Sequence, residues 1–351
     1  MATLPNLPTT VAAIYKAIED AENGPPRSHL GASQIGRPCE RDVWLAFRWA
    51  EYPHFHGKLL RLFRRGKLEE SVIIADMRTA GFTIHDADPE TGAQFVFSDH
   101  GGHMGGSMDG AGLGFPEAPE TWHVLEFKTH NSKSFDAMEK NGVASTKPEH
   151  YDQMQMYMGW SGMDRALYVA VCKDDDRLYC ERVAFNKKRF EDLRAKAERI
   201  IFSETPPPKI NKSPAFYLCK LCEMANVCHG EDFPRVNCRT CAHSTAMRDG
   251  TWKCARHDKL LSKEEQRAAC DSHLFHPSQL EEILGQPVDG DQDAILYNHE
   301  IHGRIANVAN GATSFADIGT VFTSKELTKL KTDQLAAVVQ VKKQFGGTVR
   351  T

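Results

Sequence analysis

The sequence has neither an excess of positive charge nor a long apolar run. Its 43 lysine and arginine residues are outnumbered by 47 aspartates and glutamates, giving a net charge of −4, so any nucleic-acid contact must depend on local patches. The longest apolar run near the middle of the chain covers residues 166–172. That run is far shorter than the ~20 residues that cross a bilayer, and we expect no membrane-spanning helix.

The first residues also lack the basic segment of a secretory signal. The 26 glycines and 17 prolines are too few for a collagen-like or low-complexity chain, and 41% of the residues are hydrophobic. A chain of 351 residues is long enough for one sizeable core and a smaller module. We therefore expect a folded protein located in the cytoplasm.

Residue patterning divides the chain into four parts. Helical spacing over 10–22 ends at a Gly-Pro-Pro break, and the stiff segment 203–208 precedes a cysteine-dense stretch. We assign 1–27 to an N-terminal helix, 28–230 to a core, 231–277 to a four-cysteine module and 278–351 to an accessory C-terminal region. In this last region the pattern predicts a hairpin over 294–308 and two short helices that begin at Ser324 and Thr332 and end at Gly346 and Gly347.

Helices and strands alternate in the core. The clearest helices cover 57–80 and about 148–160, and strand-like runs lie at 94–97, 121–129, 165–172 and 178–185. Elements in this order predict an α/β fold with a mixed central sheet flanked by helices.

A carboxylate and a lysine share one face of the predicted strand 121–129. Strand side chains alternate between faces, so Glu126 and Lys128 project together, and the glycine-rich segment 101–110 brings Asp109 beside them. Two carboxylates at one point suit Mg²⁺ or Mn²⁺, which prefer oxygen ligands and retain waters. Such a metal would activate water at a scissile phosphate while the lysine orients the nucleophile or neutralises charge.

Two helices offer further candidates for this site. Glu70 is the carboxylate on a stripe of helix 57–80 formed by Phe63, Gly66, Ile73 and Met77; Gly66 would leave room for it, and Glu69 ranks second. Gln153 and Tyr157 lie four residues apart on one helix face, where they would contact substrate or hold the lysine. Taken alone, Glu126 and Lys128 would be typical of a surface salt bridge, and only the combination favours a site.

Seven of the ten cysteines lie between Cys219 and Cys270. Without a secretory signal, this clustering favours metal ligation over disulfides. Three cysteines at Cys219, Cys222 and Cys228 need a fourth for a cubane cluster, and Cys39 is the natural candidate because Cys172 and Cys180 are more simply small buried hydrophobes. The second set comprises Cys238, Cys241, Cys254 and Cys270, and His243, His257, His273 and His276 are nearby substitutes. It suits a closed zinc site, with a second iron–sulfur cluster as the alternative.

Together these motifs resemble the PD-(D/E)XK nuclease superfamily, and specifically the RecB-like branch with an iron–sulfur staple, which includes the AddB nuclease domain and CRISPR-associated iron–sulfur exonucleases. The matching residues, over about 28–230, are Asp109, Glu126-Phe127-Lys128, Gln153 to Tyr157, and Cys39 with Cys219, Cys222 and Cys228. The resemblance implies a restriction-endonuclease-like core, a [4Fe-4S] cluster and a Mg²⁺- or Mn²⁺-dependent DNA exonuclease. Many members place a histidine on the first helix, whereas this chain has Glu69-Glu70, as in the related phage lambda exonuclease type.

The implied substrate is DNA, as single strands or duplex ends, and the overall look is similar to phage-encoded nucleases. A phage recombination or replication protein in the host cytoplasm would be the partner. Candidate DNA contacts are Lys58, Arg61, Arg64, Arg65, Lys67, Arg37, Arg41 and Arg48, with aromatic residues Trp44, Phe47, Trp49, Tyr52 and Phe55 interleaved. For any one of these residues, a solvated helix face or an ordinary core position is the simpler interpretation.

Two other function classes remain open. One is a DNA- or protein-binding module with a vestigial nuclease site, although intact Asp109, Glu126 and Lys128 argue against it. The other is a redox enzyme, which ranks last because no G-x-G-x-x-G dinucleotide fingerprint follows a strand.

Overall fold

The structure is a computed structural model that describes residues 9–22 and 24–346. Its centre is a five-stranded sheet in the order β2-β5-β6-β7-β8. The strands are β2 (Thr83–His85), β5 (Gly110–Leu113), β6 (His123–His130), β7 (Arg165–Cys172) and β8 (Leu178–Ala184). β6 and β7 are parallel and the other neighbours are antiparallel, so the sheet is mixed, as the sequence predicts.

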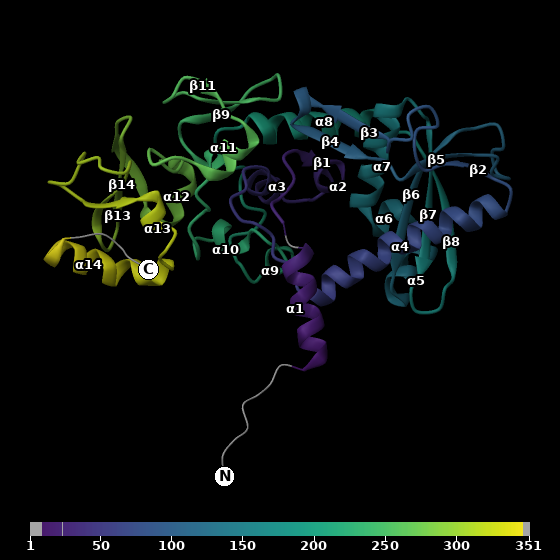
Figure 1. The fold of residues 1–351 in the computed structure, drawn as a ribbon, viewed down its shortest axis with the longest axis horizontal. Coiled ribbons are helices and arrows are strands. Elements are labelled where there is room, and N and C mark those ends of the chain that lie inside the picture. The colour runs from purple at the N-terminus through teal and green to yellow at the C-terminus, as the bar shows by residue number, and fades with distance from the viewer. Residues whose placement is uncertain (1–8, 23, 347–351) are drawn as a thin grey trace, which may run out of the picture.

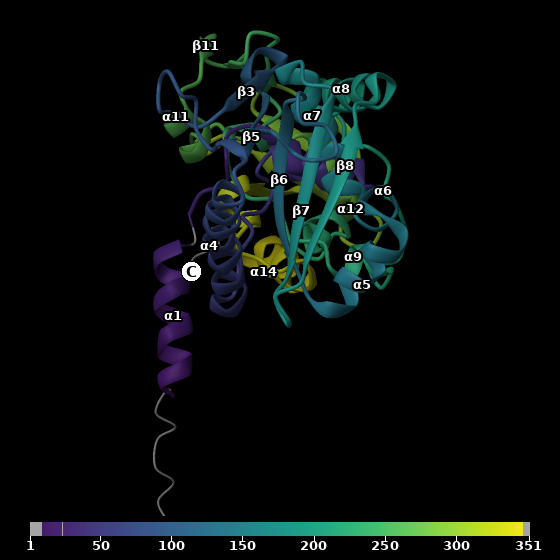
Figure 2. The same cartoon turned by 90° about the vertical axis from the view of Figure 1, so that its right-hand side faces the viewer.

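Helices cover both faces of this sheet (Figures 1 and 2). α4 (Gly57–Thr79) buries Ile73, Ile74 and Met77 against Leu125 and Phe127 of β6. α7 (Pro148–Ser161) covers the other face, with its methionines in one core with Val124 and Tyr168. The alternation of side chains along β6 thus assigns odd-numbered residues to α4 and even-numbered residues to α7. α5 (Ser132–Asn141) and α6 (Val143–Thr146) join the same core, and α8 (Lys187–Phe202) packs against α7.

A second, smaller sheet takes its strands from before β2 and from between β2 and β5. It has the order β1-β4-β3, with β1 (Leu30–Gly31), β3 (Val96–Asp99) and β4 (Met104–Ser107). Two short helices, α2 (Ala32–Ile35) and α3 (Glu40–Phe47), follow β1, and η1 (His100–Gly102) connects β3 and β4. The N-terminal helix α1 (Thr10–Glu22) lies against the start of α4, where Gly57 N donates to Glu19 Oε1 at 2.7 Å (Figure 1).

The cysteine-rich stretch packs onto the same core. It contains α9 (Tyr217–Lys220), α10 (Ala225–Cys228), η2 (Cys238–Thr240), β9 (Ser244–Ala246), β10 (Trp252–Cys254), β11 (Lys259–Leu260) and α11 (Lys263–Ala268). Arg239 is 2% exposed and its guanidinium lies 3.7 Å from the centre of the Trp49 ring. The same group donates to Phe47 O and Ser28 O, each at 2.9 Å. Arg239 is therefore a buried link between residues 231–277 and the preceding core, alongside Asn237, whose Nδ2 donates to Trp49 O at 3.0 Å.

The C-terminal region has a hydrophobic core of its own. Its sheet has the order β12-β13-β14-β15, formed by β12 (Gln286–Gly290), β13 (Ala294–His299), β14 (Gly303–Val308) and β15 (Thr320–Thr323). α12 (Pro277–Leu284), α13 (Ser324–Leu327), η3 (Thr332–Gln334) and α14 (Leu335–Phe345) accompany it. The predicted hairpin 294–308 is confirmed as β13 and β14, and the helices predicted from Ser324 and Thr332 are present. The last helix ends at Gly346, with φ of 66°, while Gly347 lies outside the described residues.

Two details of the predicted pattern are wrong. Phe63 is 50% exposed, so the buried stripe of α4 does not include it and runs instead through Leu60, Ile73, Ile74 and Met77. Cys172 is buried as predicted, but Cys180 is exposed because it lies on the edge strand β8. Over the described ranges, no helix combines the length and apolar character that a bilayer crossing needs.

We predict that Arg239→Met lowers the free energy of unfolding by about 2–4 kcal/mol, because it leaves two buried carbonyl oxygens without their donor. Urea denaturation at neutral pH would measure the change. The matched control is Arg248→Ala, which also removes a guanidinium from an aromatic ring, that of Phe202, but whose side chain is 78% exposed. Its expected cost is below about 0.5 kcal/mol. Equal costs for the two variants would contradict a fastening role for Arg239.

Candidate active site

The site lies where β5 separates from β6. Their pairing ends at Gly110 and Leu125, so the next part of β6 has an unpaired edge. Asp109, immediately before β5, fills the first position on that edge, and its Oδ2 accepts a hydrogen bond from Phe127 N at 3.0 Å. This bond positions one carboxylate beside the two residues of β6 that the sequence singles out.

Glu126 is fully buried, with 0% of its surface exposed. Its Oε1 accepts a hydrogen bond from Lys128 Nζ, whereas its Oε2 is buried and has no partner. Burial raises the pKa of Glu126 to about 7, the Lys128 ammonium opposes that rise, and Asp109 adds to it. Burial of a charged carboxylate oxygen without a hydrogen-bond donor costs free energy, and a bound cation would offset that cost.

Lys128 lies between the carboxylates. Its Nζ also donates to Phe127 O at 3.2 Å, and 27% of its side chain remains exposed. Burial alone would lower its pKa, but Glu126 and Asp109 outweigh that effect and raise the pKa of Lys128. The ammonium is therefore charged, and the side chain that carries it keeps some contact with solvent.

Glu70 approaches from α4. It is half-buried, and burial together with the charge of Asp109 raises the pKa of Glu70 while Lys128 opposes the change. Glu70 also acts on the pKa of Glu126. The structure thus brings Glu70 into the same electrostatic field as Asp109, Glu126 and Lys128. Glu70 stays the predicted ligand and Glu69 the second candidate, as the sequence ranks them, and both side chains are half-buried.

Gln153 and Tyr157 come from α7, which covers the face of the sheet that carries Glu126 and Lys128, opposite to α4. Gln153 Nε2 donates to Tyr157 Oη at 3.5 Å, a long contact. Burial, and then the charge of Glu126, raises the pKa of Tyr157, so its hydroxyl stays protonated. A β-carbon on Gly106 of β4 would lie 2.9 Å from Tyr157 Oη, so the absence of a side chain at Gly106 leaves the space that the phenol occupies.

Sequence reasoning missed three residues beside the site. His130 and Tyr168 share a hydrogen bond of 2.8 Å, and His150 lies 2.8 Å from the same hydroxyl. Two signals were present in the sequence: His130 follows Lys128 at the strand spacing of two, and His150 precedes Gln153 by one helical turn. The pairing of Tyr168 with Glu126 across β6 and β7 had no such signal.

The four cysteines predicted for an iron–sulfur cluster line one cavity of about 190 Å³. They are Cys39, Cys219, Cys222 and Cys228, and all are free thiols. Cys222 Sγ donates to Asp42 Oδ1 at 3.3 Å, and burial together with this carboxylate raises the pKa of Cys222 to about 12. The chain thus brings residue 39 and residues 219–228 to one place, although 180 residues separate Asp42 from Cys222.

The second cysteine set lines another cavity of about 400 Å³. Cys238, Cys241, Cys254 and Cys270 surround it together with His243, His257 and His273, whereas His276 does not line it. Cys270 Sγ lies 3.6 Å from His257 Nε2, and His273 Nε2 is engaged with Asn237 O at 3.0 Å. Among residues 9–22 and 24–346, no three His, Cys, Asp or Glu side chains are arranged as a metal site, in either cavity or around Lys128.

The proposed DNA-contact residues fall into two classes. Lys58, Arg61, Arg64, Arg65 and Lys67 are exposed on α4. Arg48 is 5% exposed and donates to Ser203 O, and Arg37 and Arg41 are engaged with Asp42 and Pro207 O. Trp44, Phe47 and Trp49 are buried at 0%, 4% and 0% exposure, so stacking of these three on bases is excluded. Tyr52 and Phe55 remain half-exposed.

Comparisons with known proteins give only distant structural similarity. No family model and no curated protein matches the chain. The chain is similar to the crystal structure of an alkaline exonuclease from Laribacter hongkongensis, with 17% identity and a TM-score of 0.36, over 53% of this chain and 90% of that one. It is also similar to a phage-related exonuclease from Haemophilus somnus 129PT, with 15% identity and a TM-score of 0.27, over 38% of this chain and 66% of that one.

Two glycines near the site should respond oppositely to alanine. A β-carbon on Gly66 would meet nothing nearer than Thr129 Oγ1 at 3.8 Å, so Gly66→Ala should stabilise α4 by about 0.5–1 kcal/mol. A β-carbon on Gly106 would lie 2.9 Å from Tyr157 Oη and 3.1 Å from Ala32 Cβ, so Gly106→Ala should destabilise by about 1–3 kcal/mol. Thermal unfolding of both variants checks the pair, and stabilisation of Gly106→Ala would contradict this packing.

Proposed function

We propose that the protein is a Mg²⁺- or Mn²⁺-dependent deoxyribonuclease that acts as an exonuclease on DNA ends or single strands. The observation that carries the proposal is the unpartnered Oε2 of the fully buried Glu126, next to Lys128 and within the field of Asp109 and Glu70. Three carboxylates and one ammonium supply the oxygen ligands that these cations prefer and a charge suited to a phosphate. The motifs of the sequence support the same reaction class.

In this proposal Asp109, Glu126 and Glu70 would hold the cation. A bound divalent ion lowers the pKa of a coordinated water and stabilises charge on the phosphate. Lys128 orients the attacking water or neutralises the charge that develops on phosphorus. The water oxygen forms a bond to phosphorus and releases one proton to solvent, the bond from phosphorus to the leaving nucleotide oxygen breaks, and that oxygen takes up one proton from solvent. Tyr157 and Gln153 offer neutral donors to the phosphate or hold Lys128 in place.

The exposed basic side chains of α4 supply the DNA contact. Lys58, Arg61 and Lys67 lie on the helix that also carries Glu70, so a strand gripped along α4 passes the carboxylates. The interaction would weaken steeply with salt. A role in phage-type recombination or replication, with a protein partner from that machinery, belongs to the same proposal.

The cysteines hold two further groups in this proposal. Cys39, Cys219, Cys222 and Cys228 fit a [4Fe-4S] cluster, because four free thiols from distant parts of the chain line one cavity. Cys238, Cys241, Cys254 and Cys270 would hold a closed Zn²⁺ site, because their four free thiols line a second cavity. Both groups would act structurally: the cluster would join segments that the sequence separates widely, and the zinc would hold the cysteine-rich stretch together.

The decisive experiment is digestion of end-labelled single- and double-stranded DNA in Mg²⁺ or Mn²⁺. We expect digestion by the wild type and a loss of at least about 100-fold in Asp109→Ala and Lys128→Ala. Glu70→Gln should also lose activity, whereas Glu69→Gln, the adjacent carboxylate, should stay within about threefold of wild type. Circular dichroism confirms that the variants are folded.

The label position in the same assay gives the direction of digestion. Absence of digestion by folded, metal-loaded wild type that still binds DNA would refute the nuclease and favour the binding module.

Metal analysis of anaerobically purified protein tests the two cysteine sites. Cys222→Ala should lose iron and the visible absorption while keeping zinc, and Cys241→Ala should lose zinc while keeping iron. Simultaneous loss of both metals in each variant, with the fold intact, would contradict two independent sites.

A further inference from the structure

Four hydrogen-bonded side chains run beside the candidate site, and the proposed reaction does not use them. Ser134 Oγ lies 3.2 Å from His130 Nδ1, His130 Nε2 lies 2.8 Å from Tyr168 Oη, and this hydroxyl lies 2.8 Å from His150 Nδ1. The three rings are nearly parallel, with interplanar angles of 26° to 32°. We refer to Ser134, His130, Tyr168 and His150 as the histidine chain.

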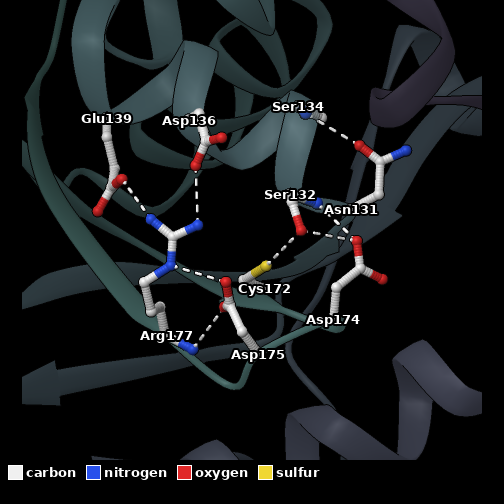
Figure 3. Close-up of polar contacts among 9 residues, drawn as sticks. All are labelled: Asn131, Ser132, Ser134, Asp136, Glu139, Cys172, Asp174, Asp175 and Arg177. Carbon is white, nitrogen blue, oxygen red and sulfur yellow. Dashed lines mark hydrogen bonds and ion pairs between the residues drawn. The ribbon is translucent and has the colours of Figure 1, made fainter.

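The serine end of the histidine chain is fixed by its surroundings. Ser134 N donates to Asn131 Oδ1 at 2.9 Å at the start of α5, and Ser132 N donates to Asp174 Oδ2 at 2.8 Å (Figure 3). These bonds tie the start of α5 to the turn between β7 and β8. The orientation of His130 is therefore set by two secondary-structure elements.

The other end lies at the active site. Tyr168 is the register partner of Glu126, and His130 follows Lys128 on the same face of β6. His150 precedes Gln153 by one turn of α7. Burial, and then the charge of Lys128, lowers the pKa of His150 to about 3, and burial lowers that of His130 to about 4. Both rings are neutral under physiological conditions.

One nitrogen of the histidine chain has no partner. His150 is half-buried, its Nδ1 faces Tyr168, and no residue of 9–22 or 24–346 bonds its Nε2. Nε2 has no partner in the described part of the chain, yet it is not one of the buried side-chain atoms without a partner. It therefore retains contact with solvent. An accessible nitrogen of a rigidly held, neutral imidazole beside Lys128 is suited to contact a ligand.

We propose that His150 Nε2–H donates a hydrogen bond to a phosphate oxygen of the DNA strand held at Asp109, Glu126 and Lys128. This inference rests on the nuclease function proposed above. In the arrangement that leaves the proton on Nε2, Ser134 Oγ donates to His130 Nδ1, His130 Nε2 donates to Tyr168 Oη, and Tyr168 Oη donates to His150 Nδ1. The phenol has a single proton, which it donates to His150 Nδ1, while its oxygen accepts from His130 Nε2. Each imidazole then has one nitrogen that donates and one that accepts a hydrogen bond, as a neutral ring requires. Tyr168 is then a positioning residue that selects the tautomer of His150.

Kinetics on a single-stranded oligonucleotide, and binding of the same oligonucleotide in EDTA, test the inference. His150→Ala should raise KM and the dissociation constant by about tenfold, with a smaller change in kcat, because it removes a bond to a charged phosphate. Tyr168→Phe keeps the ring and its packing but removes the hydroxyl that fixes the proton of His150 on Nε2. It should therefore raise both constants by about threefold. His299→Ala, which removes an imidazole from the C-terminal sheet, should change neither.

A pH series separates a neutral donor from an acid or base. The titratable groups that act on His150 are Lys128, His130 and Lys147, and each lowers its pKa further. The ratio of kcat/KM between wild type and His150→Ala should therefore be constant from about pH 6 to 9. A ratio that changes across this range would overturn the assignment of His150 as a fixed donor.

The outcomes distinguish this inference from the function on which it rests. If the wild type neither cuts nor binds DNA, both fail. If the wild type cuts DNA and His150→Ala retains wild-type KM and binding, only the inference fails. Should His150→Ala not fold, Tyr168→Phe decides, and unchanged constants in that folded variant refute the positioning role.

Discussion

Burial of the Glu126 carboxylate is the constraint on which the site depends. Removing a charged group from water is expensive unless partners compensate it, and here one oxygen has Lys128 and the other has none. The surrounding strands explain how the group comes to lie there. β5 leaves β6 after Leu125, Asp109 bonds the backbone that this exposes, and α7 closes the face above. The site is thus built at a break in the sheet.

The need to give a buried charged group its partners also explains how the cysteine-rich stretch is attached to the core. Arg239 enters the core without a carboxylate partner and is held by carbonyl oxygens and aromatic rings. Burial lowers the pKa of Arg239 to about 9, with the nearby Arg48 adding to the effect. Cys238 and Cys241 flank this arginine, so a metal held by these cysteines would also fix the segment that presents Arg239 to the core.

Local patterning predicted the elements that carry the candidate site residues. Alternation along 121–129 was enough to place Glu126 and Lys128 on one face, and the spacing of Gln153 and Tyr157 placed both on the buried side of α7. The pattern failed for Phe63, since a helix that borders solvent can expose an apolar residue at low cost. It also failed for Trp44, Phe47, Trp49 and Arg48, because sequence alone does not distinguish a base-stacking ring or phosphate contact from a core residue.

By itself the sequence determined the mixed α/β order, the faces of single strands and helices, and the grouping of cysteines. These properties follow from periodicity, which acts over a few residues. Only the tertiary structure decided that Asp109 bonds the unpaired edge of β6, that Glu70 of α4 lies in the electrostatic field of Asp109 and Lys128, and that Tyr168 links two histidines. Each of these contacts joins segments far apart in the chain, and such distances are fixed by strand register and helix packing, which no local pattern encodes.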